Sequence, residues 1–282
     1  MVRQEFRLGV TMMATDRTVT VPGLARAVEE RGFHSLYLPE HTHIPVSRDT
    51  PAPTGETELD EAYLRLPDPF VALAAAAAVT SRIQLGTGVA LVAQHDPIVL
   101  AKQIATIDQL SGGRFVLGAG FGWNREEMAD HGVAYGQRRE VVREKVLAMQ
   151  ALWRDDVAAF DGEHVRLSPS WAWPKPVQRP RVRTLLGGGA GPKLFAHVAE
   201  WADGWIPIGG AGLADAIPQM RTAVEEAGRD PESVDVVPFG TIPSEGKLSR
   251  YRDLGIREVV LRLPPADLDT TQRTLDDFAR FR

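Results

Sequence analysis

Two acid–base residues stand together where a short buried strand is expected to end. Glu40 and His41 directly follow the strand expected over 35–39. A histidine there can hold or deliver a proton near neutral pH, and a carboxylate beside it can orient it. We take Glu40 and His41 as candidate catalytic residues. His43 is expected to be exposed to solvent, although a His-x-His pair also resembles half of a metal site.

A strand interrupted by glycines is the second place where chemistry could occur. The segment 83–89 begins as a buried strand, and two glycines then break its pattern. Such glycines mark a bulge or the close approach of a ligand, and a tight barrel corner would need them equally. The segment leads to a helix that begins at Asp96-Pro97, and α/β proteins bind ligands at such strand ends. Thr87, Gly88 and Val89 are therefore candidate cofactor contacts.

A run of glycines forms the third group, between a strand expected over 183–186 and a helix beginning at Pro192. Free backbone N–H groups and the helix dipole together can hold a phosphate, while the plainer interpretation is a flexible connection. Lys193 could reach such a phosphate or lie in solvent. The candidate phosphate contacts are Gly187, Gly188, Gly189 and Ala190.

The loop after the strand expected over 114–120 adds two further candidates. Gly120 ends this strand, and Trp123 follows within the loop. The tryptophan could form an apolar wall over a flat ring, or it could be a packed loop residue. Together with His41, both are taken as candidate cofactor contacts.

These groups fall at the ends of four of eight expected strands, and nearly all eight strands are followed by helices. Strand–helix alternation predicts a parallel sheet, and eight units predict closure into an α/β TIM (β/α)8 barrel with loop insertions, over one domain, 1–282. The carboxyl ends would then meet at one mouth. A polar loop over 42–66 and an irregular insertion over 155–180 interrupt the pattern. The expected strands cover 6–12, 35–39, 83–89, 114–120, 183–186, 204–208, 234–241 and 258–263.

Composition narrows the classes of partner. The net charge of −5 argues against nucleic acid or an anionic membrane as a partner. The absence of cysteine excludes disulfides and thiolate chemistry. The first seven residues are too polar for a signal peptide, and no apolar run reaches membrane length, so we expect a cytoplasmic protein.

The chain resembles the luciferase-like monooxygenase superfamily, and within it the branch that uses the deazaflavin coenzyme F420. The resemblance covers most of the chain. The runs Leu110-Ser-Gly-Gly-Arg114 and Gly122-Trp-Asn-Arg-Glu-Glu127 are its most specific parts. The other motifs are 32–41, 68–70, 85–89, 174–180, 187–189 and 202–205.

This resemblance implies a barrel, a homodimer, and a flavin-shaped ring resting on a bulge in the third strand. The bulge would contain a non-proline cis peptide at Gly88-Val89. His41 would lie near the reactive carbon of the ring and stabilise it or deliver a proton. The implied function is hydride transfer between F420 and a small organic substrate, with a reduced-FMN monooxygenase as the alternative.

Two departures from the family pattern bear on the substrate. Glu40 stands where the family often has aspartate. Phe121 stands where sugar-phosphate dehydrogenase relatives have a glutamate, which puts a sugar phosphate in doubt. Phe121, Trp171 and Trp173 instead favour an apolar or aromatic substrate. A metal-dependent hydrolase on the same barrel is a more distant alternative, because later strand ends offer glycines and prolines rather than ligands. No metal site is expected.

Overall fold

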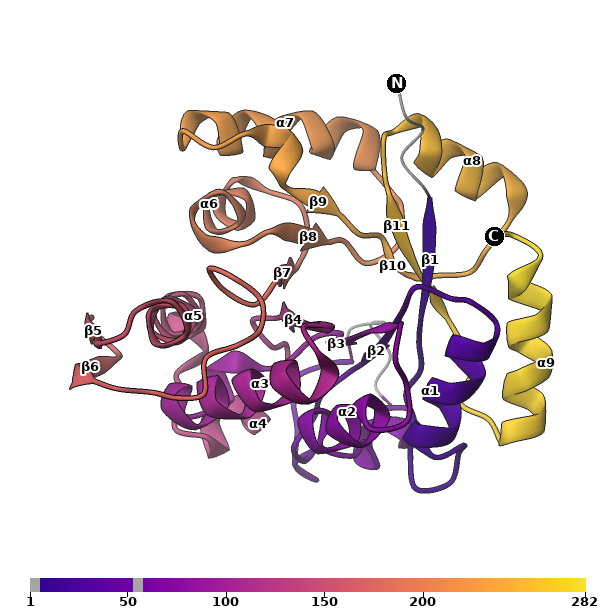
Figure 1. Ribbon diagram of the computed structural model, residues 1–282, viewed down its shortest axis with the longest axis horizontal. Coiled ribbons are helices and arrows are strands. Elements are labelled where there is room, and N and C mark those ends of the chain that lie inside the picture. The colour runs from indigo at the N-terminus through magenta and orange to yellow at the C-terminus, as the bar shows by residue number, and fades with distance from the viewer. Residues whose placement is uncertain (1–5, 53–57) are drawn as a thin grey trace.

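The computed structural model describes residues 6–52 and 58–282; residues 1–5 and the middle of the expected 42–66 loop lie outside this range. Nine strands form one parallel sheet in the order β10-β11-β1-β2-β3-β4-β7-β8-β9. The two end strands, β9 and β10, are halves of the single segment 235–241, so the sheet closes into a barrel (Figure 1). The eight expected strands and the α/β TIM barrel are confirmed.

The strands around the barrel are β1 (Arg7–Thr11), β2 (Ser35–Leu38), β3 (Gln84–Thr87), β4 (Phe115–Ala119), β7 (Thr184–Gly187), β8 (Gly204–Ile206), β9 (Asp235–Val236), β10 (Phe239–Thr241) and β11 (Glu258–Arg262). The outer helices are α1 (Val21–Glu30), α2 (Pro69–Ala77), α3 (Pro97–Ser111), α4 (Arg125–Asp130), α5 (Arg138–Arg154), α6 (Pro192–Trp201), α7 (Leu213–Glu226), α8 (Glu245–Asp253) and α9 (Leu268–Ala279).

Aspartate–proline pairs fix where two of these helices begin. The Asp68 side chain accepts the amide of Val71, and the Asp96 side chain accepts two amides at the start of α3. Each following proline takes the first helical position, where no N–H is needed. Gly112 ends α3 with φ 65°, a left-handed conformation that favours glycine. These caps set the helices that follow β2 and β3.

Side chains, rather than a channel, fill the barrel interior. Tyr37, Val116, Leu185 and Phe239 pack there with neighbours from other strands. A second and larger core lies between the sheet and the surrounding helices. Trp153, Trp201 and Trp205, expected in the core from their spacing, are all buried.

A buried charge network lies inside the barrel near the amino ends of the strands. Arg183 is bonded to Asp235 at 2.9 Å and to Glu258 at 3.3 Å, and Glu258 also accepts the Ser35 hydroxyl. Glu258 is 1% exposed, so its charge depends on these partners. Burial and the Glu258 carboxylate raise the pKa of Tyr37, which keeps this phenol protonated.

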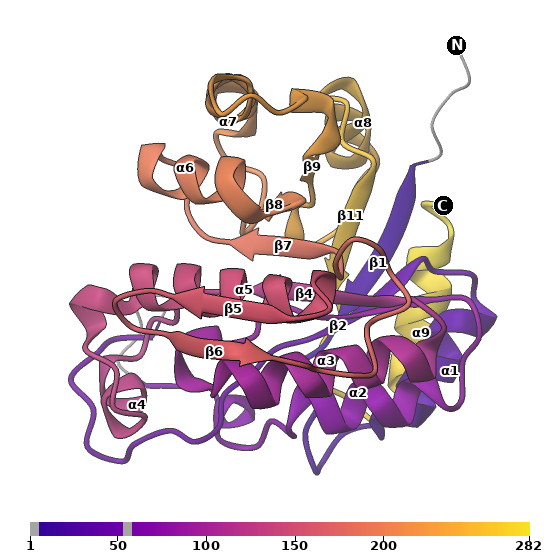
Figure 2. The ribbon, with the colours of Figure 1, turned by 60° about the vertical axis from the view of Figure 1, so that its left-hand side comes forward.

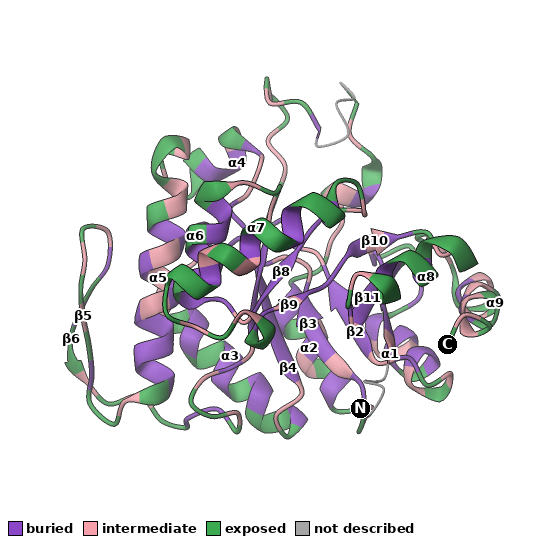
Figure 3. Cartoon of the chain, turned by 90° about the horizontal axis from the view of Figure 1, so that it is seen from above, coloured by how far each residue is buried: buried purple, intermediate pink, exposed green. Residues whose placement is uncertain are grey.

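The insertion over 155–180 is partly regular, which corrects the sequence expectation. β5 (Ala158–Asp161) and β6 (Arg166–Ser170) pair as an antiparallel hairpin beside α5 (Figures 2 and 3). The Glu144 side chain on α5 accepts the amides of residues 163–165 and so holds the hairpin turn. The burial of this carboxylate against the hairpin could not be seen in the sequence pattern.

Across the described residues, no helix combines the length and apolar character that crossing a membrane requires.

Candidate functional site

The bulge after β3 is present and contains the cis peptide. The Gly88–Val89 bond is a non-proline cis peptide, as the resemblance implied. The Gly88 amide donates to Leu38 O at 2.7 Å, and the Ala90 amide donates to Gly118 O at 2.7 Å. Pairing with β4 therefore resumes at Ala90, and Gly88 and Val89 form the bulge.

Two glycines make room for the side chain of Val89. A Cβ on Gly120 would lie 2.3 Å from Val89 Cγ2, and a Cβ on Gly187 would lie 2.9 Å from Val89 Cγ1. A side chain at either position would push the valine and move the bulge. The Thr87 hydroxyl, fully buried, donates to Gly118 O and accepts from its amide, which joins β3 to β4. Thr87, Gly120 and Gly187 therefore determine the position of the bulge.

His41 lies in a buried polar cluster at the same end of the barrel. Trp123 Nε1–H donates to His41 Nε2 at 3.2 Å, so Nε2 must be the acceptor. The ring proton therefore lies on Nδ1, which is 2.7 Å from Glu127 Oε2. His41 is 9% exposed and Glu127 is fully buried. A carboxylate behind a histidine fixes the tautomer and stabilises the ring when Nε2 takes a proton.

The Glu40 side chain does not contact His41 but bonds to other residues. Its Oε2 accepts the Leu91 amide at 2.6 Å, and its Oε1 lies 2.8 Å from His95 Nε2. Both oxygens therefore hold the segment that follows the bulge. His43 is exposed and bonded to Asp130. Over residues 6–52 and 58–282, no group of three or more His, Asp or Glu side chains is placed to hold a metal.

A cavity of about 640 Å³ opens at the mouth of the barrel. Gly88 of the bulge lines it, and most of its other walls are apolar. Tyr63 lines it too and packs against His41, with ring centroids 5.4 Å apart. The pKa of Tyr63 is raised by burial and by the neighbouring Asp60. The apolar walls are Met12, Met13, Pro39, Ile208, Phe239, Ile242, Leu263, Pro264, Pro265 and Phe278.

The glycine loop lies between β7 and α6. Gly187 is buried, whereas Gly189 and Ala190 are exposed. Gly188 is tied down, because its amide donates to Ile206 O and its carbonyl accepts Trp205 Nε1–H. Within the described residues, the Gly189 and Ala190 amides have no hydrogen-bond partner, and no side chain caps α6. These amides are free to hold an anion.

Glu127 was not identified from the sequence, although its motif was. It lies three residues after Asn124, whose side chain accepts the Glu127 amide at the start of α4. The spacing is that of a capping box, in which the glutamate would bond back to the cap. In the structure the carboxylate turns instead to His41 and to the Thr42 amide.

The aromatic residues considered for a substrate site do not share one. Trp171 and Trp173 lie on the outer insertion and are 80% and 56% exposed. Trp171 lines a small hollow over α3 and α5 rather than the mouth cavity. Phe121 is buried and packs against His197 of α6. The two tryptophans therefore lie away from the mouth cavity, and the apolar or aromatic substrate that they suggested stays a prediction.

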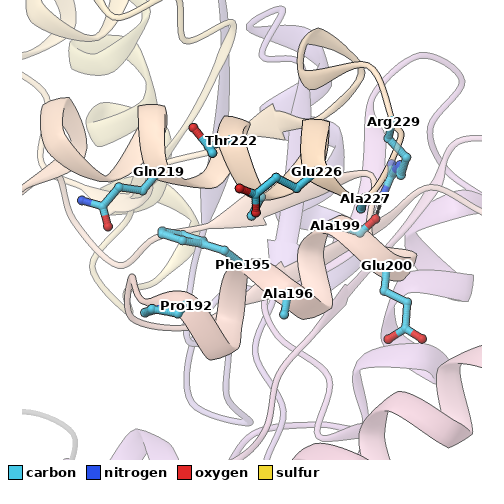
Figure 4. Close-up of a pocket in the computed structure, with 11 residues that line it drawn as sticks. Pro192, Phe195, Ala196, Ala199, Glu200, Gln219, Thr222, Glu226, Ala227 and Arg229 are labelled. Atoms are coloured by element: carbon cyan, nitrogen blue, oxygen red, sulfur yellow. Dashed lines mark hydrogen bonds between the residues drawn. The ribbon is translucent and has the colours of Figure 1, made fainter.

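A second hollow of about 840 Å³ lies outside the barrel, between α6 and α7 (Figure 4). Phe195, Ala196 and Ala199 of α6 contribute apolar surface, and Glu226 and Arg229 add charge. None of the residues suggested by the sequence lines this hollow. Of these two hollows, the mouth cavity contacts the bulge and the outer hollow does not.

A closed parallel barrel with a cavity and a buried histidine–carboxylate pair at its carboxyl end has the arrangement of a barrel enzyme. The family model described as "Luciferase-like monooxygenase" matches residues 6–247, and the chain belongs to this family of oxidoreductases.

Individual proteins similar to this chain include two relatives in sequence and a solved structure of the same fold. An uncharacterized protein of Mycobacterium tuberculosis is 46% identical over 264 residues, 93% of each chain. The F420-dependent glucose-6-phosphate dehydrogenase of Kineococcus radiotolerans is 30% identical over 215 residues, 73% of this chain and 58% of that protein. The structure of an F420-dependent secondary alcohol dehydrogenase with an F420–acetone adduct superposes with a TM-score of 0.76 at 16% identity, covering 99% and 98% of the two chains.

Proposed function

We propose that this protein is an F420-dependent oxidoreductase that transfers a hydride between the deazaflavin and a small organic substrate. The observation that carries the proposal is the Gly88–Val89 bulge beside a mouth cavity of about 640 Å³. The F420 dependence of the Kineococcus relative supports this cofactor over FMN.

The residues present fit a flat ring with an anionic tail. The cavity volume lies in the range of about 300–1,000 Å³ that is usual for small-molecule sites, and its walls are mostly apolar. Gly88 and Val89 would support the ring, and the free amides of Gly189 and Ala190 would hold its phosphate. When bound, the deazaflavin supplies the hydride chemistry.

The protein contributes placement and a proton. His41 holds its own proton at Nδ1, directed at Glu127, and would accept or return another at Nε2 by giving up the bond from Trp123. Glu127 would stabilise the charged ring because it is buried and has no other cation within bonding distance among the described residues. Glu40 acts as a positioning residue that holds the backbone after the bulge.

A paired titration tests the proposal. F420 and FMN are added separately to the purified protein, and binding is followed by quenching of tryptophan fluorescence. We expect F420 to bind with a Kd in the micromolar range or below, and FMN to bind at least tenfold more weakly. Tight FMN binding without F420 binding would refute the proposal and favour the reduced-flavin monooxygenase alternative.

We also propose that a second copy of this chain covers the outer face of α2 and α3. No charged side chain occurs from Pro69 to Val79, and Val71 is 68% exposed. Val99 and Leu110 on α3 are 56% and 63% exposed. Such a face is unusual for a monomer, because exposed apolar patches normally mark interfaces. Sedimentation should give the mass of a dimer, and Val99→Glu should shift it towards the monomer.

A further inference from the structure

Three arginines that have no acidic partner among residues 6–52 and 58–282 gather where α4 leads into α5. We call Arg125, Arg138 and Arg139 the rim arginines. Arg125 Cζ and Arg138 Cζ lie 4.8 and 3.6 Å from the ring centroid of Tyr135, and Arg139 Cζ lies 4.5 Å from that of Phe121. Aromatic rings thus hold all three cations in place.

Their positive charge is not neutralised within the described part of the chain. None of the rim arginines forms a salt bridge there. The exposed Glu140, which follows Arg139 in the sequence, is not paired with them, and two other nearby carboxylates are engaged elsewhere. Glu126 binds the amides of residues 49 and 50, and Glu200 pairs with Arg143. Burial and the charge of Arg138 both lower the pKa of Arg139. An anion placed here would relieve this repulsion.

Two guanidinium nitrogens also lack hydrogen-bond acceptors among the residues that the structure describes. Arg138 Nε and Arg139 Nη1 are buried and unpartnered, although Arg138 Nη1 donates to Tyr135 O at 2.7 Å. A buried donor without an acceptor is destabilising. Both residues are partly accessible, so an anionic ligand could reach them and supply the missing acceptors.

The rim arginines lie on the side of the mouth that carries the glycine loop. α5 and α6 are joined by the Arg143–Glu200 pair, and Phe121, under Arg139, packs against His197 of α6. Figure 2 shows α4 at the end of the barrel where α5 begins. A ligand whose phosphate lies on the amides before α6 would therefore meet Arg139 and then Arg138 as it extends outward.

We propose that the rim arginines form an outer anion subsite that binds the carboxylates of an acidic cofactor tail. The inference rests on the proposed function and deepens it. FMN ends at a single phosphate and would occupy the glycine loop alone. The acidic tail of F420 extends beyond its phosphate and would use both subsites, so the rim arginines would determine the choice between the two cofactors.

The test compares F420 with the deazaflavin nucleoside that lacks both phosphate and tail. Kd is measured for each by tryptophan quenching at low and high salt. The double variant Arg138→Gln/Arg139→Gln should weaken F420 binding about tenfold and leave nucleoside binding within twofold, because charge-assisted contacts are lost only to the tail. Arg154→Gln removes the same charge from the far end of α5 and should change neither Kd.

The outcomes separate the two proposals. Tighter binding of F420 than of the nucleoside, with a salt-dependent difference that the double variant removes, supports the subsite. Equal Kd values for the two compounds in the unaltered protein would overturn the subsite alone, and this comparison needs no variant to fold. Failure of both compounds to bind would overturn the proposed function together with this inference.

Discussion

Replacing Glu127 with glutamine should disturb His41 although the side chain keeps its size. In the structure the carboxylate accepts two N–H groups, those of His41 Nδ1 and the Thr42 amide. A glutamine has only one oxygen, so its NH₂ group must face one of these donors. If the NH₂ faces His41, the ring proton must move to Nε2, where the Trp123 N–H already donates. Every arrangement therefore loses one buried hydrogen bond.

The size of the effect follows from that lost bond. A hydrogen bond to a charged group contributes about 1.5–3 kcal/mol. Water cannot replace it, because His41 is 9% exposed and Glu127 is fully buried. Each 1.36 kcal/mol corresponds to about tenfold in rate, so Glu127→Gln should lower F420 turnover about 10- to 150-fold. Binding of F420 should change much less, since neither residue holds the tail.

Nuclear magnetic resonance of ¹⁵N-labelled protein reads the tautomer directly and needs no substrate. The unaltered protein should show His41 protonated at Nδ1 near neutral pH, and Glu127→Gln should change this pattern. Glu126→Gln is the matched control, because it removes the neighbouring charge on α4 and leaves His41 untouched. An unchanged tautomer together with turnover within twofold of the original would refute the reasoning.

Three further predictions concern the barrel itself. Gly120→Ala should destabilise the fold by about 1–3 kcal/mol in urea, and adding Val89→Ala should restore most of the loss, since the clash is with that side chain; no rescue would contradict this packing. Arg183→Met should cost about 3–5 kcal/mol by leaving Glu258 buried and unpaired, and Glu258→Gln should recover part of it. Hydrogen bonds from Thr50 and nearby amides lower the pKa of Glu126 from 4.5 to about 2, below its unfolded value. Its stabilisation should therefore be complete above pH 4.5 and lost towards pH 2, seen as lower protection factors in hydrogen exchange for the two amides that donate to it.

The barrel could be predicted because the sequence patterns that define its strands and helices each span only a few residues. Alternation in the strands, aspartate–proline caps such as Asp96-Pro97, and Gly112 at a helix end each act within a few residues. The eight strands therefore appeared from the pattern alone. The hairpin over 158–170 did not, because it depends on the Glu144 carboxylate more than ten residues earlier. Its two strands are short, and each has one buried residue, Ala158 or Leu167.

The site could be predicted only in part, for the same reason. The cis peptide at Gly88–Val89 came from the family resemblance, and His41 came from its position at a strand end. Glu127 lies 86 residues from His41 in sequence. A capping box already accounts for a glutamate at this position, so the pattern gave no reason to expect the contact with His41. Gly120 and Gly187 suggested ligand contacts, whereas the structure places them against Val89. Contacts between residues far apart in sequence, which the closed sheet brings together, cannot be predicted from a pattern that spans a few residues.

The two ends of the barrel divide their tasks. Arg183 and Glu258 secure the amino ends of the strands, whereas the cavity and the glycine loop occupy the opposite rim. Substitutions in the loops around the cavity that change which ligand binds need not disturb the Arg183–Glu258 ion pair. The loops after β8, β10 and β11 could therefore be varied broadly in directed evolution. The Arg183–Glu258 pair at the other end of the barrel would stay unchanged and would continue to stabilise the fold.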